Sequence, residues 1–159
     1  MTVHPILPIF DENSEILILG SFPSVKSRED MFFYAHPKNR FWKVISKVFD
    51  SDEPLDKEAK TDFLLKNKIA LWDVIASCDI NGSADSSIKN VIPNNLSEIL
   101  EKADIKRIYV NGKTAFKYYN KYQKEHLKKE AVCLPSTSPA NAAWSLEKLL
   151  KEWNELKNV

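Results

Sequence analysis

Four short apolar stretches recur along the chain, and polar or turn-forming residues bound each of them. They lie at Glu15–Leu19, Lys68–Val74, Arg107–Val110 and Ala131–Leu134. Short runs that are apolar throughout are typical of strands buried on both faces of a sheet. The sequence therefore predicts four central strands.

Between these stretches, apolar residues recur at helical spacing. Helices are predicted over Arg40–Phe49, Asp56–Asn67, Asn95–Ala103, Lys113–Lys128 and about Asn141–Leu156. The third of them opens with Asn95 and Glu98 at the spacing of a capping box. Strands that alternate with helices predict parallel βαβ units and an α/β fold with a sheet covered on both faces. No repeat or long linker interrupts residues 1–159, so a single domain is expected.

In such folds, ligands bind outside the carboxyl ends of the strands. The segments that follow the predicted strands are therefore the places to look for a site. They are Gly20–Ser24, Asp73–Gly82, Asn111–Lys113 and Pro135–Ala142.

Charge and cysteine content exclude several classes of protein. A net charge of +1 rules out a uniformly basic coat, while basic zones around residues 24–47 and 102–129 suit an enzyme that follows phosphates transiently. Two cysteines are too few for an iron–sulfur cluster or a four-cysteine zinc site, and no metal or other cofactor is expected. A nucleotide hydrolase or kinase would need a glycine-rich phosphate loop, which is missing.

No apolar run approaches the roughly 18 residues of a membrane span, and no signal peptide is visible. The sequence therefore predicts a soluble, cytoplasmic protein without a membrane partner. A monomer is expected.

The first candidate segment is Gly20-Ser21-Phe22-Pro23-Ser24, directly after the first predicted strand. A Gly–Pro turn at a strand end exposes backbone N–H groups and hydroxyls, which are donors suited to phosphate. On spacing alone, a structural turn without a ligand is the favoured interpretation.

The second segment runs from Met31 to Trp42 and is crowded with aromatic residues. A nucleobase turned out of its stack needs an aromatic face and polar groups for its edge. Tyr34 and Asn39 are the candidates for these roles, while Phe41 and Trp42 are expected in the core.

The third segment is Leu134-Pro135-Ser136-Thr137-Ser138-Pro139-Ala140-Asn141-Ala142, after the last strand. Three hydroxyl residues, two prolines and the expected start of a helix meet here. Hydroxyl donors and a helix N-terminus favour an anion. A helix cap with a stiff loop fits the same string.

Together these segments resemble the uracil-DNA glycosylase superfamily, and the pattern is most similar to its hypoxanthine-DNA glycosylase branch. The shared motifs are Gly-Ser-Phe-Pro first, Leu-Trp-Asp-Val on the second strand, and Ser-Thr-Ser-Pro-Ala last. The segment around Pro37–Trp42 looks like that of mismatch-specific uracil/thymine glycosylases. The resemblance covers about Ile9 to Leu150. It implies a three-layer α/β/α sandwich with a four-stranded parallel sheet in the order 2-1-3-4.

The resemblance also implies roles for individual residues. Asn39 matches the catalytic asparagine, Tyr34 the aromatic that stacks on the base, and Phe22 and Asp73 positions near the base. Ala140 and Asn141 match the wedge that fills the gap left by the flipped base. The expected DNA contacts are Gly20, Ser21, Pro23, Ser24, Ser136, Ser138, Pro139, Ala140 and Asn141.

Two departures from the family pattern change the expected chemistry. Phe22 stands where efficient uracil enzymes carry Asp or Asn, and Ser136 replaces a histidine found in many relatives. The remaining route is dissociative, with an oxocarbenium-like sugar and an anionic leaving base. Asn39 does not titrate near neutral pH, but its carbonyl oxygen is expected to orient water.

The other titratable residues have plainer interpretations. His36 either protonates a leaving purine or fixes the loop beside Pro37, and the second is favoured. His4 and His126 show no site context, and Lys38 and Arg40 fit a surface position. Ser83 and Asp85 lie in an expected loop near the pocket, where they could touch base or DNA. A solvated face is expected for Lys113, Lys117, Lys121, Lys124 and Lys128.

The sequence thus predicts a monofunctional DNA N-glycosylase that acts on double- or single-stranded DNA containing a damaged base. Hypoxanthine is the expected base, with uracil as a further substrate. The alternatives are a uracil or G:T/G:U mismatch glycosylase, and a catalytically dead nucleic-acid binder on the same scaffold.

Overall fold

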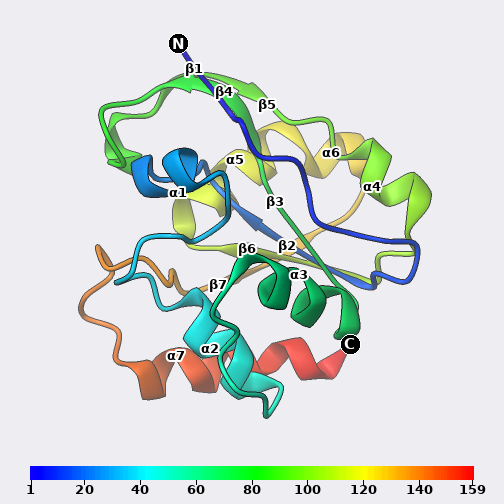
Figure 1. The fold of residues 1–159 in the computed structure, drawn as a ribbon. Helices are drawn as coiled ribbons and strands as arrows, with labels where there is room; N and C mark the ends of the chain where they lie inside the picture. Colours follow the sequence, from blue (N-terminus) through cyan, green and yellow to red (C-terminus); the bar gives the residue numbers. More distant parts are fainter.

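A computed structural model describes residues 1–159 (Figure 1). At its centre lies a parallel four-stranded sheet in the order β3-β2-β6-β7. Its strands are β2 (Ile16–Gly20), β3 (Ile69–Asp73), β6 (Arg107–Asn111) and β7 (Ala131–Leu134). These are the four predicted strands, and their order confirms the predicted 2-1-3-4 arrangement.

Strand β2 shows why the sheet needs cover on both faces. All five of its residues are buried, and successive side chains point to opposite faces. Ile16 and Ile18 belong to one apolar cluster, and Leu17 and Leu19 belong to the other. A strand of this kind is stable only in the middle of a three-layer structure.

Helices cover the first face of the sheet and form the lower layer of Figure 1. They are α2 (Phe41–Val48), α3 (Lys57–Lys66) and α7 (Leu146–Trp153), followed by the 3₁₀ turn η2 (Asn154–Asn158). Phe41 and Trp153 meet edge to face in this layer, with ring centroids 5.9 Å apart. The second face packs against α4 (Ser97–Lys102), α5 (Lys113–Tyr122) and α6 (Lys124–Leu127). The three-layer prediction is confirmed.

A second, antiparallel sheet was not predicted. It joins β1 (Thr2–Val3), β4 (Ile75–Asp79) and β5 (Lys89–Pro93), with the short turn η1 (Asp85–Ser87) in the β4–β5 connection. Cys78 and Asp79, which belong to the segment expected to follow the second strand, therefore lie in a strand of their own. The chain bends at Val74, where the Asn94 amide donates to the carbonyl oxygens of Asp73 and Ile75.

The largest error in the predicted helices concerns the last one. Its expected start at Asn141 is wrong, because Ser145 accepts the Lys148 N–H and caps a helix that begins at Leu146. Residues 135–144 therefore form an irregular loop, and Asn141 gains nothing from a helix N-terminus.

The other helices differ in smaller ways. The predicted helix over Lys113–Lys128 breaks at Gln123 into α5 and α6. Asn95 accepts the Ser97 N–H, but Glu98 returns no bond, so the expected capping box does not form. A short helix, α1 (Val25–Asp30), was not predicted. None of the helices has the length and apolar character needed to cross a membrane.

Candidate active site

Three loops and one hairpin meet beyond the carboxyl ends of the parallel strands, on the left of Figure 1. We call residues 20–24 loop 1, residues 31–40 loop 2 and residues 135–144 loop 3. The β4–β5 hairpin connection, residues 80–88, lies beside loop 1 and α1. The segments predicted to follow the strands lie at this edge, as the parallel topology requires.

A buried hydrogen-bond network joins loop 2, loop 3 and the end of β6. The Asn111 amide donates to the Thr137 hydroxyl (3.0 Å), and the Thr137 hydroxyl donates to Asn39 Oδ1 (2.8 Å). The Thr137 N–H also donates to Asn111 Oδ1. Thr137 is fully buried, so this network holds the Asn39 side chain from the interior of the protein. Neither Thr137 nor Asn111 was predicted to have a role, although Asn111 lies at the end of a buried strand, where site residues are expected.

The same network determines which atom of the Asn39 side-chain amide remains free. Its Oδ1 accepts a second hydrogen bond, from the Phe41 backbone N–H at 2.9 Å. A backbone N–H can only donate, so the orientation of the amide is fixed. A carbonyl oxygen has two lone pairs, and both are used. Asn39 therefore offers its amide nitrogen, which makes no hydrogen bond within the protein, and the expected carbonyl contact to water is not available.

Tyr34 lies at the centre of the loops in a left-handed conformation with φ +50°. One face of its ring stacks on Phe41, with centroids 4.1 Å apart and planes at 16°. Its hydroxyl is buried and has no hydrogen-bond partner. Burial, with a smaller contribution from the Asp73 charge, raises the pKa of Tyr34 far above its ordinary value. The phenol is therefore protonated, and only one ring face remains for a ligand.

Asp73 ends β3 and is paired with a histidine that sequence analysis set aside. His4 Nε2 donates to Asp73 Oδ2 at 2.7 Å, and both side chains are almost completely buried. His4 Nδ1 accepts the Ile6 N–H, which places the ring proton on Nε2. The statement that His4 lacks site context is thus wrong. No sequence signal marks His4, because β1 brings it to the site from 69 residues away.

Gly20 is required because Asp73 and Tyr34 close over it. A Cβ atom at position 20 would lie 2.4 Å from Asp73 Oδ1 and 2.9 Å from the Tyr34 hydroxyl. Neither neighbour is a freely moving side chain, since His4 holds Asp73 and Phe41 holds Tyr34. The glycine after β2 therefore serves close packing at the floor of the site.

Phe22 is buried rather than displayed toward a ligand. It is 8% exposed, and its ring meets His4 edge to face at 5.8 Å. The Arg28 guanidinium lies 5.6 Å from the ring centroid. Because Phe22 occupies this position beside the His4–Asp73 pair, loop 1 has no carboxylate of its own.

The two hydroxyls of loop 1 already have partners in the protein. Ser21 donates to Asp85 Oδ1 at 3.3 Å, and Ser24 caps α1 by accepting the Ser27 N–H. Pro23 is buried. Phosphate contact by Ser21, Pro23 and Ser24 stays a prediction, but these bonds weaken the case for it.

Loop 3 keeps its hydroxyl donors. Ser136 and Ser138 each accept a backbone N–H, from Ser138 and Ala140, which leaves each O–H hydrogen free to donate. Ala140 and Pro139 are exposed. Asn141 instead turns its amide inward to the Ser136 carbonyl.

Arg40 was expected at the surface, and this prediction is wrong. Its side chain instead holds loop 3 in place. Its guanidinium donates to the carbonyl oxygens of three loop 3 residues: Ser138, Asn141 and Trp144. His36, which is exposed, accepts the Lys38 N–H through Nδ1. This contact agrees with the favoured role of His36 in fixing loop 2.

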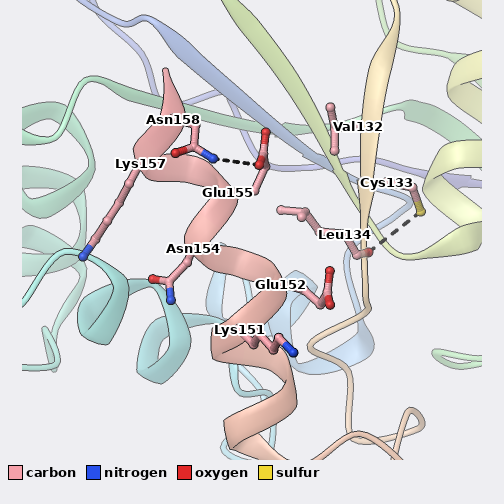
Figure 2. A pocket seen from close by; sticks show the side chains of 9 residues that line it. All are labelled: Val132, Cys133, Leu134, Lys151, Glu152, Asn154, Glu155, Lys157 and Asn158. Atoms are coloured by element: carbon pink, nitrogen blue, oxygen red, sulfur yellow. Dashed lines mark hydrogen bonds between the residues drawn. The ribbon is translucent and has the colours of Figure 1, made fainter.

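One hollow on the surface lies away from these loops. It has a volume of about 630 Å³ and runs between β7 and the end of α7 with η2 (Figure 2). Its lining includes Leu134, Lys151 and Glu155, and contains no residue from loop 1 or loop 2. The candidate site, formed by loops 1 to 3 and the hairpin, is thus separate from this hollow.

Comparison with known proteins defines the family to which this chain belongs. The family model described as "Uracil DNA glycosylase superfamily" matches residues 7–157. Two relatives are named hypoxanthine DNA glycosylase. The one from Methanosarcina barkeri is 35% identical over 113 residues, 70% of this chain and 72% of the relative. The one from Methanosarcina acetivorans is 34% identical over 139 residues, covering 86% and 87%.

A solved structure agrees with these matches. The solution structure of a Methanosarcina acetivorans protein, provisionally named a uracil DNA glycosylase, superposes with a TM-score of 0.79 and 31% identity over 96% of each chain. The chain belongs to the uracil DNA glycosylase superfamily. It is a DNA glycosylase, an enzyme that hydrolyses N-glycosyl bonds and acts on damaged DNA.

Proposed function

We propose that this glycosylase removes hypoxanthine, the base of deoxyinosine, from DNA. The two relatives named hypoxanthine DNA glycosylase support this substrate. The structural observation that carries the proposal is Phe22, which packs against His4 where efficient uracil enzymes place an acid or amide. A site without that group is poorly equipped for rapid attack on uracil and depends on stabilising the leaving base.

Asn39 supplies the donor that a leaving purine needs. As the glycosidic bond breaks, negative charge spreads over the ring nitrogens and the carbonyl oxygen of hypoxanthine. The free amide nitrogen of Asn39 donates to one of these acceptors, and the Thr137 and Phe41 bonds hold it in place beforehand. A preorganised donor of this kind is worth about 10²- to 10³-fold in rate.

Tyr34 stacks on the flipped base through its free face. Phe41 supports the other face at 4.1 Å, so the ring needs no reorganisation to receive a base. Base–aromatic stacking contributes about 1–3 kcal/mol. Asp73 is covered by Gly20 and Tyr34, so a direct contact of its carboxylate with the base remains a prediction.

Loop 3 holds the DNA backbone through the hydroxyls of Ser136 and Ser138. The exposed Ala140 enters the space that the flipped base leaves. Its small side chain fills that space poorly, so weakly paired lesions are preferred, and single strands or mispairs are processed faster than matched duplex. The enzyme works as a monomer of one domain.

A substrate panel tests the proposal directly. Duplexes and single strands with deoxyinosine, deoxyuridine, deoxyxanthosine or a thymine mispair are incubated with excess enzyme, and abasic sites are revealed by alkaline cleavage. Deoxyinosine is expected to be cleaved fastest. Preferential cleavage at deoxyuridine or at thymine mispairs would overturn the choice of base, and binding without abasic sites would point to a dead binder.

Asn39→Ala links the activity to the site. The variant should retain the fold and lose about 10²-fold or more in single-turnover rate. Lys38→Ala, at the neighbouring exposed position, is the matched control and should retain the rate. An unchanged rate in Asn39→Ala would remove Asn39 from the mechanism.

A further inference from the structure

The β4–β5 connection is fastened to loop 1 and α1 at three successive points. The Val25 N–H donates to the Ser83 hydroxyl at 2.9 Å, and Arg28 donates to the Gly82 carbonyl at 2.7 Å. The third contact is the Ser21 hydroxyl on Asp85. Sequence analysis expected this segment near the pocket without defining its place. The bonds fix it beside the first strand's loop.

Asp85 is consequently a carboxylate held beside loop 1, which has none of its own at Phe22. It contacts Ser21, the residue directly before Phe22. Its side chain remains partly open to solvent, whereas Asp73 is sealed beneath Gly20 and Tyr34. Water therefore reaches Asp85 and not Asp73.

The surroundings of Asp85 favour a proton acceptor. Partial burial of the carboxyl group raises the pKa of Asp85, the negative charge of Asp73 adds to the effect, and the Ser21 and Thr114 hydroxyls oppose it. A carboxylate with a raised pKa is a stronger base. The other titratable groups near it are Tyr34, Cys78 and Tyr118, all of which have raised pKa values, and Arg28 on α1.

The reaction needs such a group, because the Asn39 carbonyl is saturated. Attack by water at the sugar requires an acceptor for its proton. A carboxylate next to loop 1 also repels phosphate, so the Ser21–Asp85 contact fits water and a cationic sugar better than the DNA backbone.

Building on the proposed function, we propose that Asp85 binds the attacking water and takes its proton, in place of the acid that loop 1 lacks. The bond between the sugar C1′ and the base nitrogen breaks, and its electron pair leaves with the base. The water oxygen bonds to C1′ and one water proton passes to Asp85. The departing base takes a proton from solvent, Asp85 later releases its own, and the products are an abasic site and the neutral base.

Asp85→Asn tests this assignment in the full-length protein. Single-turnover excision from deoxyinosine duplex should fall by about 10²- to 10⁴-fold, the usual contribution of a general base. Affinity for the lesion duplex should stay the same or increase, because a negative charge is lost. The wild-type rate should decline as pH falls through the pKa of Asp85, and this decline should vanish in the variant.

Further variants separate catalysis from hairpin packing. Asp85→Glu should recover part of the rate, and added formate should rescue Asp85→Ala, because the position is open to solvent. Asp79→Asn, which changes a half-exposed carboxylate of β4 in the same hairpin, is the control and should behave as wild type. A loss that neither Glu nor formate restores would assign Asp85 to packing and overturn the proposal.

Unchanged excision by Asp85→Asn across the pH range would overturn it equally. The test is separable from the choice of substrate. If the wild-type enzyme removes uracil and not hypoxanthine, the proposed substrate fails, while the same comparison on deoxyuridine still decides the role of Asp85.

Discussion

The hydroxyl of Thr137 donates to the side-chain carbonyl oxygen of Asn39 at 2.8 Å and so connects loop 3 to loop 2. Thr137 is fully buried and receives a bond from Asn111 in return. The orientation of the proposed catalytic amide thus depends on two residues to which no substrate contact is assigned. This arrangement makes Thr137 a positioning residue.

Thr137→Val should slow excision by about ten- to a hundredfold, the range expected when a reacting group is displaced by a fraction of an ångström to an ångström. Valine has the shape of threonine but leaves the Asn111 amide without its acceptor, at a cost of about 1–3 kcal/mol in stability. Single-turnover kinetics and thermal unfolding measure the two effects. Thr137→Ser, which keeps the hydroxyl, should restore the rate, and a rate equally low in both variants would contradict the positioning role.

Tyr34→Ala should weaken binding to lesion duplex by about 1–3 kcal/mol, since one base–aromatic stack is lost. Binding to undamaged duplex should change much less. Fluorescence anisotropy with matched duplexes provides the comparison. Equal losses on both duplexes would instead assign Tyr34 to packing against Phe41.

Tyr34→Phe isolates the unpartnered hydroxyl. Because burial raises the pKa of Tyr34 well above 10, the phenol stays neutral in the native protein while the unfolded chain ionises above that pH. Its contribution to stability is therefore complete below pH 10 and declines as pH rises beyond it. The difference in unfolding free energy between wild type and Tyr34→Phe should shift in favour of the variant above pH 10, as urea titrations at several pH values would show. A difference independent of pH would contradict the burial of this phenol.

The fold was predictable because it follows from local patterns. Five consecutive buried residues in β2 and similar runs elsewhere define the parallel sheet, and alternation with helices defines its layers. The antiparallel sheet escaped prediction because β4 follows β3 after the single residue Val74, so the two strands read as one apolar run and a loop. The start of α7 was misplaced because Asn141 and Ser145 are both good caps. Only tertiary contacts show that Asn141 is hydrogen-bonded to Arg40 and Ser136 instead of capping the helix.

The site was predictable only where its residues follow strands or share family motifs. Tyr34, Asn39 and Gly20 were singled out in this way, and their binding and catalytic roles stay predictions. His4 follows a strand of the antiparallel sheet that no sequence pattern had linked to the loops, whereas Asp85 was expected near the pocket but without a defined partner. The free end of Asn39 likewise depends on the distant Thr137, so its role as a donor follows from three-dimensional contacts alone.

Gly20→Ala should lower both stability and activity. The new Cβ would overlap Asp73 Oδ1 at 2.4 Å, and overpacking of this kind costs about 1–3 kcal/mol. Displacement of Tyr34 or Asp73 should reduce excision as well. Ile99→Val is the control, because it removes one methyl group from the buried core at α4, away from the loops, and costs about 0.5–1.5 kcal/mol. Thermal unfolding should show a loss of stability in both variants. Excision per folded molecule should fall only in Gly20→Ala. An equal loss of excision in both variants would show that close packing at Gly20 is not specific to the site.

The affinity for DNA should depend on loop 3 more than on the lysine-rich helix. In α5 and α6, Lys117 and Lys121 each lie 5.2 Å from the ring centroid of the next tyrosine, and Lys124 pairs with Glu130 at 3.5 Å. Only Lys113, at the start of α5, stands at the carboxyl edge of the sheet. Few counterions should therefore be displaced, and affinity should fall only gently with salt. Neutralising Lys117, Lys121 and Lys124 together should leave affinity and salt slope nearly unchanged, whereas Ser136→Ala with Ser138→Ala should weaken lesion and undamaged DNA alike. Binding titrations across salt concentrations measure both, and a steep slope abolished by the triple lysine variant would place the DNA on the helix instead of on loop 3.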